Sequence, residues 1–149
     1  MTLTRETSAG YMTNWAARLF TRELERQLAP TGIAPAYMPV LFALADGGTL
    51  TQKELARRAA VEQPTMAMTL NRMLRDGMIT RQPDPADRRC TLVTLTPLAH
   101  GKIDAVEGVA SAINALALDQ LAPDERHQFL ALLGKVIAVL EARDRTLGD

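Results

Sequence analysis

Apolar residues recur at helical spacing along most of this chain and alternate only in one short region. Where they recur every three or four positions, the residues between them are polar, which is the pattern of an amphipathic helix with one buried side. This spacing predicts helices over residues 8–29 and 36–45, two more between Thr51 and Gly77, a long one from Pro97 and a last one from Pro123. Partial alternation of β-branched residues predicts strands over residues 78–82 and 90–95, with a brief one at 48–50. The chain is therefore expected to be mainly α, with a minor β component.

The stretch between Thr51 and Gly77 carries start and stop signals for two helices. Thr51 and Glu54 form a T-x-x-E capping box, in which each side chain satisfies a free backbone N–H at the start of the first helix. A break at residues 60–63 follows, and Pro64 then suits the first turn of a second helix, where its missing N–H is harmless. Gly77 stands where a left-handed C-terminal cap is expected. The apolar stripe of the second helix comprises Met66, Leu70, Met73 and Leu74.

The opposite face of that second helix is polar and cationic, and it carries no acidic residue. When such a helix lies in the major groove of DNA, its N-terminal residues are nearest the base edges. Gln63, Thr65 and Met68 are therefore candidate base readers, and the arginines nearer the C-terminus are candidate phosphate ligands. For the helix alone, an ordinary solvated face is an equally good interpretation. The candidate DNA contacts of this helix are Gln63, Pro64, Thr65, Met68, Thr69, Arg72 and Arg75.

A stiff, charged turn joins the two longer predicted strands. Residues 83–89 read PDPADRR, in which the prolines restrict the backbone and the aspartates favour turn geometry. Two adjacent arginines at a protruding tip, Arg88 and Arg89, suit a narrow minor groove, where the negative potential is strongest. Asp87 is expected to orient Arg89 through a charge-assisted hydrogen bond. For the turn alone, an ordinary charged hairpin tip is the alternative.

Helix, turn, helix and basic hairpin, in that order, indicate a winged helix-turn-helix, a DNA-reading module. The runs LNRMLRDGMITR and DPADRRCTLVTLT resemble the recognition helix and wing of the multiple antibiotic resistance regulator (MarR) family. The D-x-R signature of that family matches Asp87 and Arg89, and its closing L-T matches Leu95 and Thr96. The resemblance extends over about residues 11–143.

The resemblance implies a domain layout and also has two departures. Ala99 stands where the family usually has glycine, which a helix tolerates, whereas Pro64 and Met68 are uncommon on a recognition helix and leave the DNA sequence open. The implied layout is a single MarR-like domain over residues 1–149, with a winged helix over 36–96 and helical dimerisation parts over 8–29 and 97–143.

The terminal helices carry more apolar surface than a small winged helix can bury. The helix after Pro97 has a 3-4-3 apolar spacing, which is typical of a helix packed along another helix. The two stripes are Val106, Val109, Ile113 and Leu116, then Phe129, Leu132, Leu133, Val136, Ile137 and Leu140. A second copy of the chain is the expected partner, and an isologous dimer would hold two recognition helices on the order of 34 Å apart. An intramolecular helical bundle is the alternative.

A small-molecule effector is implied by the resemblance alone. Members of the family often bind small aromatic or phenolic anions between the dimer helices and the winged part. The candidates are the large aromatics of the N-terminal half and one nearby arginine, namely Tyr11, Trp15, Arg18, Tyr37 and Phe42. Core and interface packing explains the same residues more simply.

Composition and charge narrow the function further. No apolar run reaches the roughly 18 residues that a membrane span needs, and no basic-then-apolar leader opens the chain, so a cytoplasmic protein is expected. The net charge is zero, but residues 51–89 hold eight basic and five acidic side chains, so this stretch is +3 and the remainder −3. Such a local excess predicts moderate non-specific DNA affinity with a strong salt dependence.

Other chemistry finds little support in the sequence. Cys90 is the lone cysteine; its neighbouring arginines could lower a thiol pKa, but the family's peroxide sensors place their reactive cysteine near the N-terminus, so an incidental thiol is expected. His100 and His127 lack Cys or His neighbours at ligand spacing, so no metal is expected. No nucleophile elbow, phosphate loop or paired carboxylates occur, so neither catalysis nor a cofactor is expected.

The sequence therefore leads to a specific hypothesis. The chain is expected to be a homodimeric, sequence-specific transcriptional regulator, a repressor that binds a pseudo-palindromic operator in double-stranded DNA. A small aromatic or phenolic effector that prefers a conformation with mis-spaced wings would lower operator affinity by its differential binding. Two alternatives stay open: a ligand-insensitive or architectural DNA binder, and a winged helix that serves protein interaction.

Overall fold

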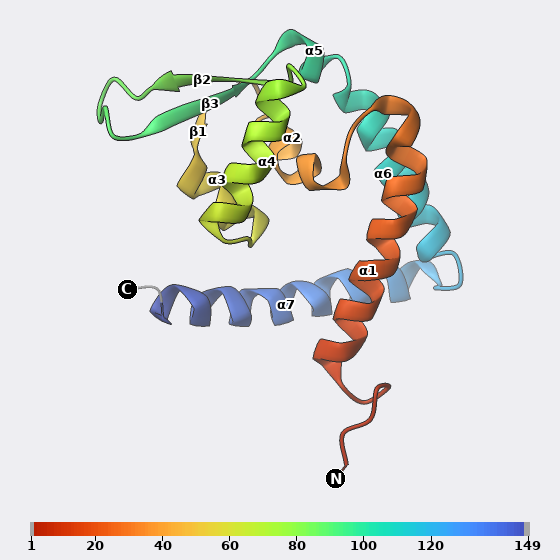
Figure 1. Cartoon of the computed structure of the whole chain (residues 1–149). Helices are drawn as coiled ribbons and strands as arrows, with labels where there is room; N and C mark the ends of the chain where they lie inside the picture. Colours follow the sequence, from red (N-terminus) through yellow and green to blue (C-terminus); the bar gives the residue numbers. More distant parts are fainter. Residues whose placement is uncertain (1, 148–149) are drawn as a thin grey trace. The chain divides into compact units, whose positions relative to one another are not determined.

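The computed structural model describes residues 2–147, which are mainly helical with one small antiparallel sheet, as the sequence predicts. In chain order, the elements are α1 (Ala9–Leu28), η1 (Ala29–Thr31), η2 (Pro35–Tyr37), α2 (Met38–Ala43), β1 (Leu50–Thr51), α3 (Gln52–Ala59), α4 (Gln63–Arg75), β2 (Ile79–Pro83), β3 (Thr91–Leu95), α5 (Pro97–His100), α6 (Ile103–Ala117) and α7 (Pro123–Leu147) (Figure 1). The chain gathers into two compact units that divide after Ser111, inside α6. None of the helices described here combines the length and apolar composition needed to span a lipid bilayer.

The helix-turn-helix forms where its local signals predict it. The Thr51 hydroxyl accepts the Glu54 N–H at 3.2 Å, and the Glu54 carboxylate accepts the Thr51 N–H at 2.7 Å, which completes the capping box of α3. Ala60 ends α3 in the left-handed conformation, with a φ of 52° that a residue with a Cβ seldom adopts. Three residues therefore make the turn before α4. Gly77, with a φ of 73°, follows the end of α4 as expected.

A three-stranded antiparallel sheet in the order β1-β3-β2 forms the base of the wing. The two long strands pair from Ile79 opposite Leu95 to Pro83 opposite Thr91. β1 adds only two residues, and its Thr51 pairs with Leu92 while it also caps α3. One threonine thus belongs to both the sheet and the helix-turn-helix, so the two share a fixed junction.

One hydrophobic core lies in the unit that ends at Ser111. It takes buried side chains from the end of α1, from η2 and α2, from both helices of the helix-turn-helix, from the sheet and from α5 and the start of α6. On α4, Met66, Leu70 and Met73 are buried, but Leu74 is 43% exposed. Leu74 lies about 80° around the helix from Met66, because eight residues make slightly more than two turns. Leu74 is therefore at the edge of the stripe and outside the core.

The long helix expected from Pro97 is interrupted. The Thr96 hydroxyl caps α5 by accepting the Ala99 N–H at 3.3 Å, but the Lys102 N–H then bonds to the Ala99 carbonyl, three residues back. This tight turn separates α5 from α6. The Lys102 ammonium donates to the Thr31 carbonyl, a contact between segments far apart in sequence. The prediction of one continuous helix was wrong, and the break carries a local signal, because Gly101 is the C-cap residue of α5 and glycine disfavours a helix interior.

Candidate DNA-binding surface

The polar face of α4 is open to solvent. Met68 is 70% exposed, Thr69 is half-buried, and the other candidate contacts on this helix are exposed. No side chain caps the start of α4: Glu62 occupies the N-cap position without a capping hydrogen bond. The free N–H groups and the positive end of the helix dipole there favour an anionic partner. The start of α4 thus offers Gln63 and Thr65 together with an electropositive backbone.

The wing tip between β2 and β3 is closed by its own hydrogen bonds. The Asp84 N–H donates to the Cys90 carbonyl and the Cys90 N–H donates to the Asp87 carbonyl, both at 2.9 Å. Each aspartate side chain also accepts a backbone N–H two residues on, Asp84 from Ala86 at 2.9 Å and Asp87 from Arg89 at 3.0 Å. These are Asx turns, which fix the loop without neighbouring elements.

Asp87 meets Arg89 at the backbone rather than at the side chain. The hydrogen bond expected between Asp87 and Arg89 is present, with the Asp87 carboxylate accepting the Arg89 N–H at 3.0 Å. Within residues 2–147, no ion pair joins that carboxylate to the Arg89 guanidinium. The reason is geometric: in an Asx turn, the carboxylate reaches the N–H two positions ahead in sequence. Arg88 and Arg89 are both exposed, and they belong to a loop whose backbone is fixed by these hydrogen bonds.

A hydrogen bond joins the recognition helix to the wing at a residue that the sequence did not single out. Arg81, on β2, donates from Nη1 to Oδ1 of Asn71 on α4 at 2.9 Å. The bond fixes the Asn71 amide and holds a further cation between α4 and the wing. Asn71 was identifiable as part of the polar face of α4, but the packing that brings Arg81 to it leaves no trace in local spacing.

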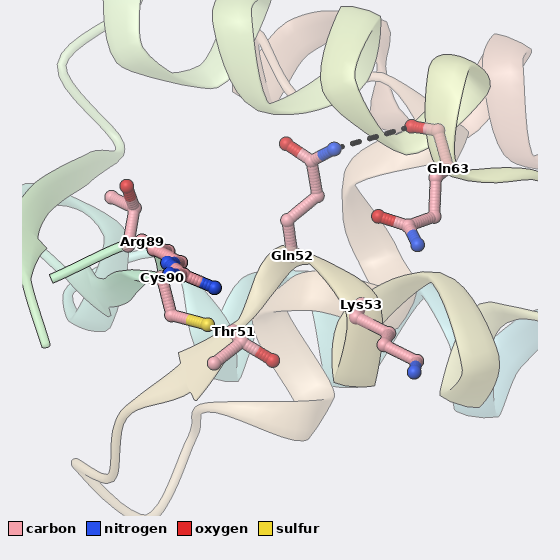
Figure 2. Close-up of a pocket in the computed structure, with 7 residues that line it drawn as sticks. Thr51, Gln52, Lys53, Gln63, Arg89 and Cys90 are labelled. Atoms are coloured by element: carbon pink, nitrogen blue, oxygen red, sulfur yellow. Dashed lines mark hydrogen bonds between the residues drawn. The ribbon is translucent and has the colours of Figure 1, made fainter. Parts of the chain in front are cut away.

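A hollow of about 370 Å³ lies at the base of the wing, beside the starts of α3 and α4. In Figure 2, the Gln52 side chain extends toward Gln63, and its Nε2 donates to the Gln63 carbonyl at 3.5 Å, while Arg89 and Cys90 lie across the hollow. Lys53, on α3, also lines the hollow. Neither Gln52 nor Lys53 was predicted as a site residue. The lining comprises Thr51, Gln52, Lys53, Gln63, Arg89, Cys90 and Thr91.

The five candidate effector residues lie in different environments. Tyr11 and Trp15 stack edge to face on α1, with ring centroids 6.4 Å apart, and the Arg5 guanidinium lies 4.3 Å from the Trp15 ring centroid. Arg18 is exposed on the same helix. Phe42 is 42% exposed on α2, whereas Tyr37 is only 1% exposed. The arginine that covers Trp15 is thus Arg5, which the sequence did not indicate.

The Cys90 thiol is half-buried beside the wing loop. Burial raises the pKa of this thiol, and the nearby Asp87 carboxylate raises the pKa further. The sequence suggested a lowering by the neighbouring arginines, but the aspartate contact, with Sγ 3.7 Å from Oδ2, acts in the opposite direction.

The described residues also bring together no group of three or more acidic, histidine or cysteine side chains that could hold a metal ion.

An exposed recognition helix beside a basic wing defines a winged-helix DNA-binding protein. Comparison with known proteins gives the family: residues 31–89 match the model of the MarR family. The HTH-type transcriptional repressor NicR of Pseudomonas putida is 30% identical over 128 residues, which cover 86% of this chain and 81% of NicR. This chain belongs to the MarR family, and it is a DNA-binding transcriptional regulator.

Two solved structures place the fold beside known DNA-binding regulators. BpsR of Bordetella bronchiseptica, whose DNA binding is regulated by 6-hydroxynicotinic acid, has a TM-score of 0.82 at 25% identity, and the match covers 91% of this chain and 97% of that one. A variant of E. coli MarR complexed with operator DNA has a TM-score of 0.81 at 25% identity, with 91% and 99% covered.

Proposed function

We propose that this chain acts as a homodimeric repressor that binds a pseudo-palindromic operator and is released by a small aromatic anion. The observation that carries the proposal is the open, acid-free face of α4 beside a wing loop that holds two exposed arginines on a fixed backbone. The similarity to NicR, which is named a transcriptional repressor, supports negative control.

Within the proposed complex, α4 lies in the major groove. Gln63, Thr65 and Met68 near its N-terminus contact base edges, where Met68 makes an apolar contact such as one with a thymine methyl. Arg72, Arg75 and the Thr69 hydroxyl bind phosphates, and Pro64 makes an apolar contact at the start of the helix. The wing enters the minor groove with Arg88 and Arg89, and Asp87 keeps their backbone in the projecting turn.

Exposed apolar surface supports the dimer. On α7, Leu132 is 60%, Val136 47% and Leu140 63% exposed, and none of the described α7 side chains is buried. On α1, Met12 is 43% and Leu19 is 50% exposed. Monomeric proteins seldom leave apolar residues of this size open along whole helices, so we assign both helices to contact with a second copy.

The effector is proposed as a small aromatic carboxylate or phenolate. The aromatic pair Tyr11 and Trp15, with the cations Arg5 and Arg18 on or before the same helix, offers stacking surface and positive charge. Phe42 adds an exposed ring on α2, whereas Tyr37 would have to leave the core to touch a ligand. The regulation of BpsR by 6-hydroxynicotinic acid supports this chemical class.

Selection of duplexes from a random-sequence library by the purified protein tests the DNA-binding part. We expect enriched sequences with two inverted half-sites whose centres are about 10 base pairs apart, since two recognition helices of a dimer are spaced by one turn of DNA. Gln63→Ala or Thr65→Ala should reduce the preference among DNA sequences strongly and should lower the affinity for random duplexes only slightly. Enrichment of single half-sites, or no enrichment, would contradict the dimeric operator.

Fluorescence of Trp15, the single tryptophan, tests the effector part. Titration with 6-hydroxynicotinic acid should change this fluorescence and release the selected operator over the same concentration range. Arg18→Gln should shift both curves to higher concentration. Unchanged operator affinity across a panel of aromatic carboxylates and phenols would favour the alternative, a ligand-insensitive or architectural DNA binder.

A further inference from the structure

The last turn of the recognition helix contains an acid in an unfavourable place. Asp76 is the C-cap residue of α4, where the negative end of the helix dipole opposes a carboxylate. It also follows directly on the cationic face proposed to meet phosphates. The carboxyl nevertheless has a lowered pKa, chiefly because it accepts a hydrogen bond from Tyr37, so the charged form is held in place by specific partners.

Tyr37 meets α4 from the core side and makes the principal contact with Asp76. Its hydroxyl donates to Asp76 Oδ2 at 2.5 Å, across 39 positions of sequence, while its ring is 1% exposed among the core side chains. Burial raises the pKa of this phenol, so it stays protonated and remains a donor at neutral pH. A buried donor aimed at a surface carboxylate fixes the end of α4 to the segment η2.

The same tyrosine also contacts a proposed phosphate ligand. The Arg72 guanidinium carbon lies 5.7 Å from the centroid of the Tyr37 ring, within the range of a cation–π contact. Arg72 and Asp76 are four residues apart and therefore lie on one side of the helix. Tyr37 thus holds one turn of α4 at two points, with its ring against Arg72 and its hydroxyl on Asp76. Arg75 adds a longer contact to Asp76, at 3.6 Å.

We propose that Tyr37 is a positioning residue for DNA binding, which sets the end of the recognition helix and holds Arg72 toward the phosphates through Asp76 and its own ring. This inference rests on the proposed function and gives Tyr37 a role other than effector binding. An arginine restrained before it meets DNA loses less side-chain freedom on binding, and a fixed helix end keeps it aligned.

Two substitutions test this role from opposite sides of the contact. Tyr37→Phe keeps the buried ring and removes the hydroxyl, and we expect about a fivefold to tenfold loss of operator affinity, the equivalent of one ordinary hydrogen bond. Asp76→Ala truncates an exposed side chain and removes the partner of the Tyr37 hydroxyl, so thermal unfolding is measured to show that the variant is folded. Removing an acid near DNA ordinarily strengthens DNA binding. Weaker operator binding by Asp76→Ala would therefore be explained by the lost positioning of Arg72.

The measurement is fluorescence anisotropy with the selected operator at several salt concentrations, alongside thermal unfolding of each variant. Tyr37→Phe in an Arg72→Ala background should weaken binding much less than it does in the parent protein, because the residue being positioned is gone. Asp104→Ala, on the exposed side of α6, is the matched acid-removal control and should bind like the parent.

The outcomes separate the two proposals. If the parent protein ignores duplex DNA at low salt, the proposed function itself fails. If the parent binds and Arg72→Ala weakens binding, but Asp76→Ala tightens it or Tyr37→Phe leaves it unchanged, the positioning role is overturned. The positioning role is equally overturned if the Tyr37→Phe and Arg72→Ala losses simply add.

Discussion

The winged-helix core and the last helix contain the same kinds of apolar residue in very different surroundings. In the core, Leu55 and Leu70 are 1% and 0% exposed, whereas on α7 Leu132 and Leu140 are 60% and 63% exposed. Both sets follow helical spacing in the sequence. The difference teaches that an apolar stripe indicates that a helix packs against something, but the stripe does not tell whether the same chain or another copy supplies that surface.

Leu132→Asp should have the largest effect, because it would break the proposed dimer at its apolar surface. We expect a monomer by analytical ultracentrifugation and a loss of operator affinity of about a hundredfold or more, since two linked half-sites no longer act together. The core of the winged helix should stay folded by circular dichroism. Ala138→Asp, which places the same charge on the opposite side of α7, is the control. A dimeric Leu132→Asp protein would remove α7 from the interface.

Leu70→Ala tests the other side of the comparison. Truncating this fully buried side chain should lower the free energy of unfolding by about 3 kcal/mol, the sum of lost transfer energy and a cavity. The loss should be equal at all protein concentrations in urea titrations. For Leu140→Ala on α7, the loss should instead depend on protein concentration, because that residue would be buried only in the dimer. If the loss of stability depended on protein concentration equally in Leu70→Ala and Leu140→Ala, the distinction between the core and the α7 surface would be refuted.

Arg89→Ala tests whether the wing contacts DNA, and it changes neither the core nor the apolar surface of α7. Operator affinity should fall about tenfold, and the slope of log K against log salt should flatten by about one unit for the lost phosphate contact. Arg143→Ala on α7 removes the same charge from the second unit and serves as the reference. If affinity and slope stay at parent values in anisotropy titrations, Arg89 does not contact DNA.

Ala60→Gly has the smallest expected effect and concerns backbone strain in the unit that holds the core. Ala60 adopts a φ of 52°, which disfavours a residue with a Cβ by about 1 kcal/mol relative to glycine. The glycine variant should therefore unfold at a slightly higher temperature by calorimetry. Gly77→Ala, the reverse change at a φ of 73°, should lower that temperature. A lower melting temperature for Ala60→Gly would show that flexibility outweighs the relieved strain.

Features set by local interactions were predictable from the sequence. The capping box at Thr51, the start of α4 near Pro64 and the left-handed Gly77 all depend on residues within one turn of each other. The two wing strands followed from β-branched residues and a proline-rich turn. They were predicted at 78–82 and 90–95 and lie at 79–83 and 91–95, so no boundary moved by more than one residue. The family followed from the wing signature, which is also local.

Features set by tertiary contacts were not predictable. The hydrogen bond from Lys102 joins the turn after α5 to Thr31, the fixed amide of Asn71 involves Arg81, and the Arg5 contact with Trp15 involves a segment before α1. The sequence grouped Tyr37 with effector-binding aromatics because its ring is large, and nothing within a helical turn of it points to Asp76. These contacts arise only when distant elements pack.

The place of Thr51 in both β1 and the cap of α3 has a consequence for how the wing is attached to the helix-turn-helix. Thr51 is the last residue of β1 and also the N-cap of α3, so a change in the tilt of the sheet would also move the start of the helix-turn-helix. The paired strands are therefore attached to the start of the helix-turn-helix through this residue, and the loop beyond Pro83 and Thr91 lies outside the strand pairing.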